Sequence, residues 1–149
     1  MRKQSDKQPE PSAALHLWTY EAALRAIPYL RDVVRSLREH WLQLQSARRQ
    51  IERLDSRPGR PDRQTLIRRA AAVQELDQAD IKIDETFDEL KAIDVYCFDP
   101  VQGLALIPFG KGDELAWYVF ALFSPQGLEA WRLHGDPLEM RRPLEQNAV

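Results

Sequence analysis

Cysteine is almost absent from this chain, which has one among 149 residues, at position 97. A single cysteine excludes an intrachain disulfide and is typical of a protein kept in a reducing compartment, so we expect a cytoplasmic protein. The residues around Cys97 are apolar. This predicts a buried, inert thiol rather than a nucleophile.

Long hydrophobic runs are also missing. The longest run, Leu115–Phe123, has nine residues, whereas a helix that crosses a bilayer needs about 20. Residues 1–14 are polar and contain prolines, which predicts a disordered tail and no signal peptide. Residues 145–149 are expected to be a frayed tail. We therefore expect a single domain over residues 15–144 with no membrane contact.

Motifs for catalysis or ligand binding are lacking as well. The three histidines, His16, His40 and His134, have no metal-ligand spacing. The sequence has no Glu-x-x-His motif, glycine-rich phosphate loop or nucleophile elbow. We expect no metal, no cofactor and no enzymatic activity. The formal net charge of −2 provides no overall attraction to nucleic acid or membranes.

The chain does contain a long amphipathic pattern between Thr19, a good N-cap, and Leu54. Pro28 predicts a kink or restart near its beginning. Such a helix spans roughly 50 Å, so its apolar stripe needs a second long helix beside it. The stripe repeats every three or four residues and is interrupted only at Arg48; its members are Ile27, Leu30, Val34, Leu37, Trp41, Leu44 and Ile51.

A second long helix follows a turn at residues 56–61, which contain two prolines and a glycine. We expect it to begin at Pro61 or Asp62 and to end near Ile93. A turn centred near Gly59 aligns three opposite charges across the hairpin, which predicts a ladder of ion pairs: Arg38–Asp80, Arg35–Asp84 and Arg31–Asp88. The apolar stripe of this helix is expected to consist of Leu66, Val73, Leu76, Ile83, Phe87 and Leu90.

Short apolar runs separated by turn residues make up the rest of the chain: Val95–Phe98, Leu104–Pro108, Leu115–Phe123 and Leu128–Leu133. They predict an antiparallel meander of three to four strands. The expected fold class is α+β, with a long antiparallel helical hairpin over residues 15–93. The hairpin packs against a small antiparallel β-sheet over residues 94–136.

Several short motifs carry a family resemblance: Trp18-Thr19-Tyr20-Glu21-Ala22, Ile27-Pro28, the segment Gly103–Pro108, Trp131, and Arg142-Pro143-Leu144. In these residues the chain resembles an uncharacterised bacterial family, domain of unknown function twenty-two oh three. The family pattern usually has Trp-His where this chain has Trp131-Arg132, and Cys-Trp-Arg where it has Tyr118-Val119-Phe120. The resemblance implies a long helical hairpin followed by a small β-meander, and it implies no activity.

Charge is distributed unevenly along the hairpin. The segment Glu75–Asp99 has nine acidic residues against two lysines. Its carboxylates lack the convergent partners that a metal site needs. Around the expected tip, eight arginines face three acidic residues: Arg48, Arg49, Arg53, Arg57, Arg60, Arg63, Arg68 and Arg69. They indicate either a basic prong for phosphate backbones or an acidic partner, or simply a solvated helix surface. The tip has no aromatic residue, which argues against binding of single strands.

A second candidate site follows the last strand, where four residues of mixed chemistry lie close together in the sequence: Trp131, Arg132, His134 and Asp136. This cluster indicates either a small-molecule site or an ordinary sheet edge.

The strand run Leu115–Phe123 lacks polar alternation, so both of its faces are apolar. We expect one face, formed by Tyr118, Phe120 and Leu122, to be covered by a second copy of the chain. The alternative is that residues 136–144 fold back over it. The leading functional hypothesis is therefore a non-enzymatic, homodimeric interaction or assembly module. A nucleic-acid-associated protein that uses the arginine tip is the alternative, and a small-molecule site at Trp131–Asp136 is the third.

Overall fold

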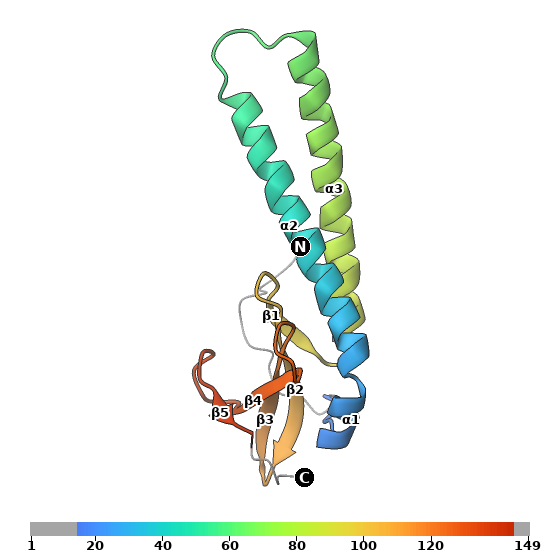
Figure 1. Ribbon diagram of the computed structural model, residues 1–149, viewed down its shortest axis with the longest axis vertical. Coiled ribbons are helices and arrows are strands. Elements are labelled where there is room, and N and C mark those ends of the chain that lie inside the picture. The colour runs from blue at the N-terminus through green and yellow to red at the C-terminus, as the bar shows by residue number, and fades with distance from the viewer. Residues whose placement is uncertain (1–14, 145–149) are drawn as a thin grey trace.

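The computed structural model describes residues 15–144 and confirms the α+β fold. A long helical hairpin stands on a five-stranded antiparallel sheet, which lies at the open end of the hairpin (Figure 1). The tails expected at residues 1–14 and 145–149 lie outside the described residues. The elements are α1 (Tyr20–Arg25), α2 (Ile27–Asp55), α3 (Arg63–Lys91), β1 (Tyr96–Asp99), β2 (Leu104–Lys111), β3 (Glu114–Ala121), β4 (Leu128–Leu133) and β5 (Arg142–Pro143).

The start of the hairpin follows the cap and proline signals of the sequence. Thr19 Oγ1 accepts a hydrogen bond of 3.0 Å from the Ala22 N–H and caps α1. The helix then breaks at Ala26, and α2 begins with Pro28 in its first turn. The missing N–H of a proline breaks no helical hydrogen bond there. The predicted restart is therefore confirmed.

The buried side chains of α2 that face α3, called the seam of α2 below, continue along the helix to the tip of the hairpin. Ala47 and Leu54 are 2% and 5% exposed, so they carry the apolar repeat past Arg48, where the sequence indicated an interruption. The facing seam of α3 consists largely of small side chains at seven-residue intervals: Thr65, Ala72, Ala79 and Thr86, all buried. Leu66, which was expected in this seam, is 54% exposed. A small side chain lets two helices approach closely, but it adds little to a hydrophobic pattern.

The arginines expected to form an interhelical ladder have other partners, so that prediction is wrong. Arg31 donates to the carbonyl oxygens of Ser124 (3.3 Å) and Pro125 (2.8 Å) in the β3–β4 turn. Arg38 Nε donates to the Val101 carbonyl oxygen in the β1–β2 turn at 2.7 Å. Both arginines therefore fasten sheet turns to α2.

The remaining ladder arginine, Arg35, pairs with Asp32 on its own helix at 3.4 Å. The predicted alignment of the helices is nevertheless close to the observed one at the open end. There the Tyr29 hydroxyl donates to a Glu89 carboxylate oxygen at 2.6 Å.

The sheet has the strand order β1-β2-β3-β4-β5, one strand more than the sequence predicted. One face packs against α1 and the base of the hairpin in the main core. Tyr118, Phe120 and Leu122 lie on this face and are only 7%, 0% and 7% exposed. The prediction that they form an open dimer face is therefore wrong, because the chain's own helices cover them.

The opposite face of the sheet is closed by segments from both ends of the described chain. Its centre, Trp117 and Val119, is fully buried. Leu15, before α1, and Leu138, between β4 and β5, pack against it. Residues 136–144 do fold back onto the sheet, as the alternative proposed: Leu144 packs against the main core on the expected face, whereas Leu138 covers the opposite face.

Candidate functional site

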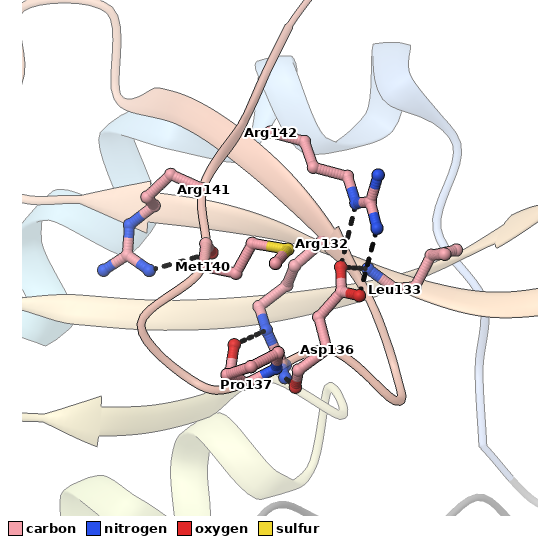
Figure 2. A network of polar contacts seen from close by, with 7 residues as sticks. All are labelled: Arg132, Leu133, Asp136, Pro137, Met140, Arg141 and Arg142. Atoms are coloured by element: carbon pink, nitrogen blue, oxygen red, sulfur yellow. Dashed lines mark hydrogen bonds and ion pairs between the residues drawn. The ribbon is translucent and has the colours of Figure 1, made fainter.

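The polar cluster after β4 is organised around a buried arginine (Figure 2). Arg132 is fully buried, and its guanidinium group donates to two backbone carbonyl oxygens, those of Pro137 (3.2 Å) and Asp136. A buried charge requires such partners, because desolvation without them is costly. Strand alternation places Arg132 on the same face as Trp117, so the side chain runs beneath the loop that covers this face.

Asp136 also stabilises the loop between β4 and β5, because it bonds residues of both strands. Its carboxylate accepts two hydrogen bonds from Arg142, at 2.8 and 3.0 Å, and one from the Leu133 N–H at 2.9 Å. The guanidinium of Arg142, followed by the Leu133 N–H, lowers the pKa of Asp136 to about 2. The carboxylate is therefore charged at neutral pH and engaged in holding β5 against β4.

Trp131 and His134 do not converge on this pair. The Trp131 ring lies against the cations of Lys111 and Arg142, with distances of 4.8 and 5.3 Å to the ring centroid. His134 Nδ1 accepts a 3.1 Å hydrogen bond from Trp117 Nε1. The four residues of the predicted site thus do not converge on one pocket, and the contacts described above join them to other parts of the same chain.

The depressed pKa of Asp136 predicts a pH-dependent contribution to stability. A carboxylate with a lowered folded pKa stabilises the fold above its unfolded value, near 4, and this contribution is lost as the pH falls towards 2. The melting temperature of the unmodified protein should therefore exceed that of Asp136→Asn above about pH 5. Thermal unfolding followed between pH 2 and 7 should show the two converging in acid. A constant difference across this range would contradict the assignment, and the exposed Glu139→Gln serves as control.

The basic tip projects away from the sheet, as predicted (Figure 1). Arg69 pairs with Asp55 through two hydrogen bonds of 2.7 and 3.1 Å, which join α3 to the end of α2. Arg57 donates to Thr65 Oγ1 at 3.3 Å, and Arg53 donates to a neighbouring glutamine. Within the described residues, the side chains of five exposed arginines of the tip form no hydrogen bond or ion pair: Arg48, Arg49, Arg60, Arg63 and Arg68.

An open groove of about 1280 Å³ lies at the hairpin base, between α1, the turns of the sheet and the segment after β4. Tyr20 and Leu24 contribute from α1, and Arg38 lies over the Phe123 ring at 5.1 Å. Its described lining contains neither histidine nor cysteine. Sequence reasoning missed this groove because turns far apart in the chain assemble it. Over residues 15–144, no group of three or more potential metal ligands comes together.

These features define a class of α+β protein in which a helical hairpin with a basic tip projects from a five-stranded antiparallel sheet. The chain belongs to the family described as "Uncharacterized conserved protein (DUF2203)", whose family model matches residues 16–121. This confirms the resemblance seen in the sequence. The match spans the helices and β1 to β3, whereas β4, β5 and the polar cluster follow it.

The other comparisons add no relative. Neither the curated proteins nor the solved structures contain a match to this chain. Among the described residues, no helix combines the length and the apolar character needed to cross a membrane.

Proposed function

We propose that this protein is a non-enzymatic interaction module that works as an oligomer, with the hairpin as its binding arm. One observation carries the proposal: the hairpin extends far beyond the sheet. The helices α2 and α3 have 29 residues each, about 43 Å, and the sheet lies only at their base (Figure 1). The contacts of Arg31 and Arg38 with sheet turns also lie in the lower part of α2.

Apart from the open groove at the hairpin base, the rest of the described surface offers less to a partner. Both faces of the sheet are covered within the chain, and the polar cluster is engaged in holding its own loop. The distal hairpin, in contrast, buries little more than its seam, for example Ala47 and Leu54 against Thr65 and Ala72. The outer faces of both helices therefore remain accessible, which is the arrangement used when a helix presents one face to a partner.

Light scattering coupled to size exclusion tests the oligomeric part of this proposal. The full chain should show a mass above that of the monomer, and the mass should rise as the protein concentration is raised from low to high micromolar. A monomer mass over the whole range would contradict an oligomeric module.

A nucleic-acid-associated function is the second candidate, and the unpaired tip arginines favour it. Neutralising phosphates releases counterions, so binding should be measurable at about 50 mM salt and fall steeply by about 200 mM. Reversing Arg57, Arg60 and Arg63 to glutamate should abolish binding to generic DNA and RNA in a fluorescence anisotropy titration. The reversal of Arg25 and Arg35, exposed arginines near the hairpin base, should have little effect. Absence of binding at the lower salt concentration would eliminate this candidate.

A further inference from the structure

The outer face of α3 carries two of the three exposed large apolar side chains of this helix. Ile67 and Ile81 are 51% and 57% exposed, whereas the only exposed large apolar residue of α2 is Tyr29, at its base. The seam of α3 contains Thr65, Ala72 and Ala79. Ile67, Gln74 and Ile81 each follow a seam residue by two positions, about 200° around the helix. They therefore form a line that points directly away from α2.

Charge along α3 is strongly polarised. The segment Arg63–Gln74 contains no acidic residue and three arginines, of which Arg69 is paired with Asp55 of α2 and Arg63 lies in line with Gln74. The segment Glu75–Lys91 contains seven acidic residues and two lysines. A second α3 lying parallel would place like charges together, whereas an antiparallel one places each basic half against an acidic half. The order of charges along α3 is therefore complementary to that of a second α3 that runs in the opposite direction.

We propose that the outer face of α3 binds the same face of a second copy of this chain, antiparallel, with Gln74 at the two-fold axis. This inference rests on the proposed oligomeric function and assigns its interface. Ile67 and Ile81 both lie seven residues from Gln74, so Ile67 of one copy faces Ile81 of the other. Arg63 and Glu85 both lie eleven residues from Gln74, so they face each other outside the isoleucine contacts.

The size of this surface sets the strength of the association. A single pair of helices in contact along their outer faces belongs at the low end of interface areas, below about 1,200 Å². Such interfaces are transient, and we expect dimers to form in the micromolar range and to weaken with salt, because charge pairs flank the contact. The two sheets then lie at opposite ends of the dimer. The arginine tip of each copy lies beyond the two-fold axis, on the side of the partner's sheet.

Disulfide cross-linking tests the register. Residues at a two-fold axis approach closely enough for a disulfide, which needs Cα atoms within about 7 Å. Gln74→Cys should therefore give a covalent dimer under mild oxidation. Gln43→Cys, exposed on α2, should not. The native thiol does not interfere, because Cys97 is 2% exposed and its burial raises its pKa to about 12.

Single cysteines at the isoleucine positions distinguish the two orientations. In the antiparallel pair the two copies of position 67 are about 21 Å apart. Ile67→Cys alone should therefore not cross-link, whereas a mixture of Ile67→Cys and Ile81→Cys should. Cross-linking of Ile67→Cys with itself, or of Gln43→Cys as readily as Gln74→Cys, would overturn the proposed interface.

Sedimentation equilibrium of Ile81→Lys separates this inference from the proposed function. The substitution removes an apolar contact and sets a cation against the basic half of the partner copy, so the dissociation constant should rise about tenfold or more. Leu24→Lys, at an exposed position of α1, is the control and should leave it unchanged. If Ile81→Lys dimerises with an unchanged dissociation constant, the proposed interface is wrong, but the protein can still be an oligomeric module. An unmodified chain that remains monomeric throughout overturns both.

Discussion

Replacing Phe120 with glutamate should unfold the protein rather than separate two copies of it. Phe120 is fully buried among the side chains of the main core, between the sheet and the hairpin base. Loss of a buried phenylalanine costs about 3–5 kcal/mol, and a carboxylate at this position adds the cost of an unpaired buried charge. The sum is comparable to the whole stability of a typical domain, about 5–15 kcal/mol.

A matched variant on the same stretch of chain controls for the added charge. Phe123 is 67% exposed, so Phe123→Glu should retain the circular dichroism spectrum and the cooperative unfolding of the unmodified protein. Phe120→Glu should lose both. A folded Phe120→Glu monomer with an unchanged melting temperature would show that this face of the sheet is open, in contrast to the packing described above.

Replacing Arg132 with methionine should lower the free energy of unfolding by about 3 kcal/mol. Methionine fills much of the same buried volume, but it leaves the partly buried carbonyl oxygens of Asp136 and Pro137 without their donor. The loop that covers the Trp117 face would then lose its anchor. Urea unfolding measures the change, which should appear as a lower midpoint.

Arg141→Met is the control for this change, because Arg141 lies in the same segment but is exposed and donates only to nearby carbonyl oxygens at 3.2 Å. Its loss should cost less than about 0.5 kcal/mol. Equal effects of the two substitutions would show that Arg132 has no special structural role.

Local chemistry made much of the fold predictable. Thr19 caps α1 as expected, and Asp62, expected at the start of the second helix, caps α3, because a side-chain oxygen that accepts an early N–H is a short-range feature. The restart near Pro28 likewise follows from the missing N–H of one residue. The positions of the strands follow from apolar runs bounded by turn residues.

The orientation of β3 could not be predicted in the same way. Both faces of this strand are apolar, so a period of two gives no sign of which face meets the helices. The cover of the second face comes from Leu15 and Leu138, which are single side chains far from β3 in the sequence. The α3 seam was misplaced because Thr65, Ala72 and Ala79 are too small or too polar to mark a hydrophobic stripe.

The candidate site was misjudged for a related reason. Trp131 and Arg132 are adjacent in the sequence, and adjacent residues in a strand point to opposite faces. An arginine is normally expected at the surface, so nothing in the sequence indicated that Arg132 is fully buried beneath its own loop. The arginine tip was easier to predict, because breaker residues and charge at the end of a hairpin both indicate exposure.

The most direct test of the hairpin as the binding arm is a pair of intermolecular distances, measured by pulsed electron spin resonance. A nitroxide label would be attached at Gln74→Cys on α3 or at Asp113→Cys in the β2–β3 turn. The interface proposed here predicts a short distance, below about 30 Å, between labels at position 74. Labels at position 113 should be more than about 50 Å apart, since each sheet lies beyond the end of α3, 17 residues from Gln74. A short distance between the labels at position 113, with none between those at position 74, would place the contact on the sheet and contradict the account.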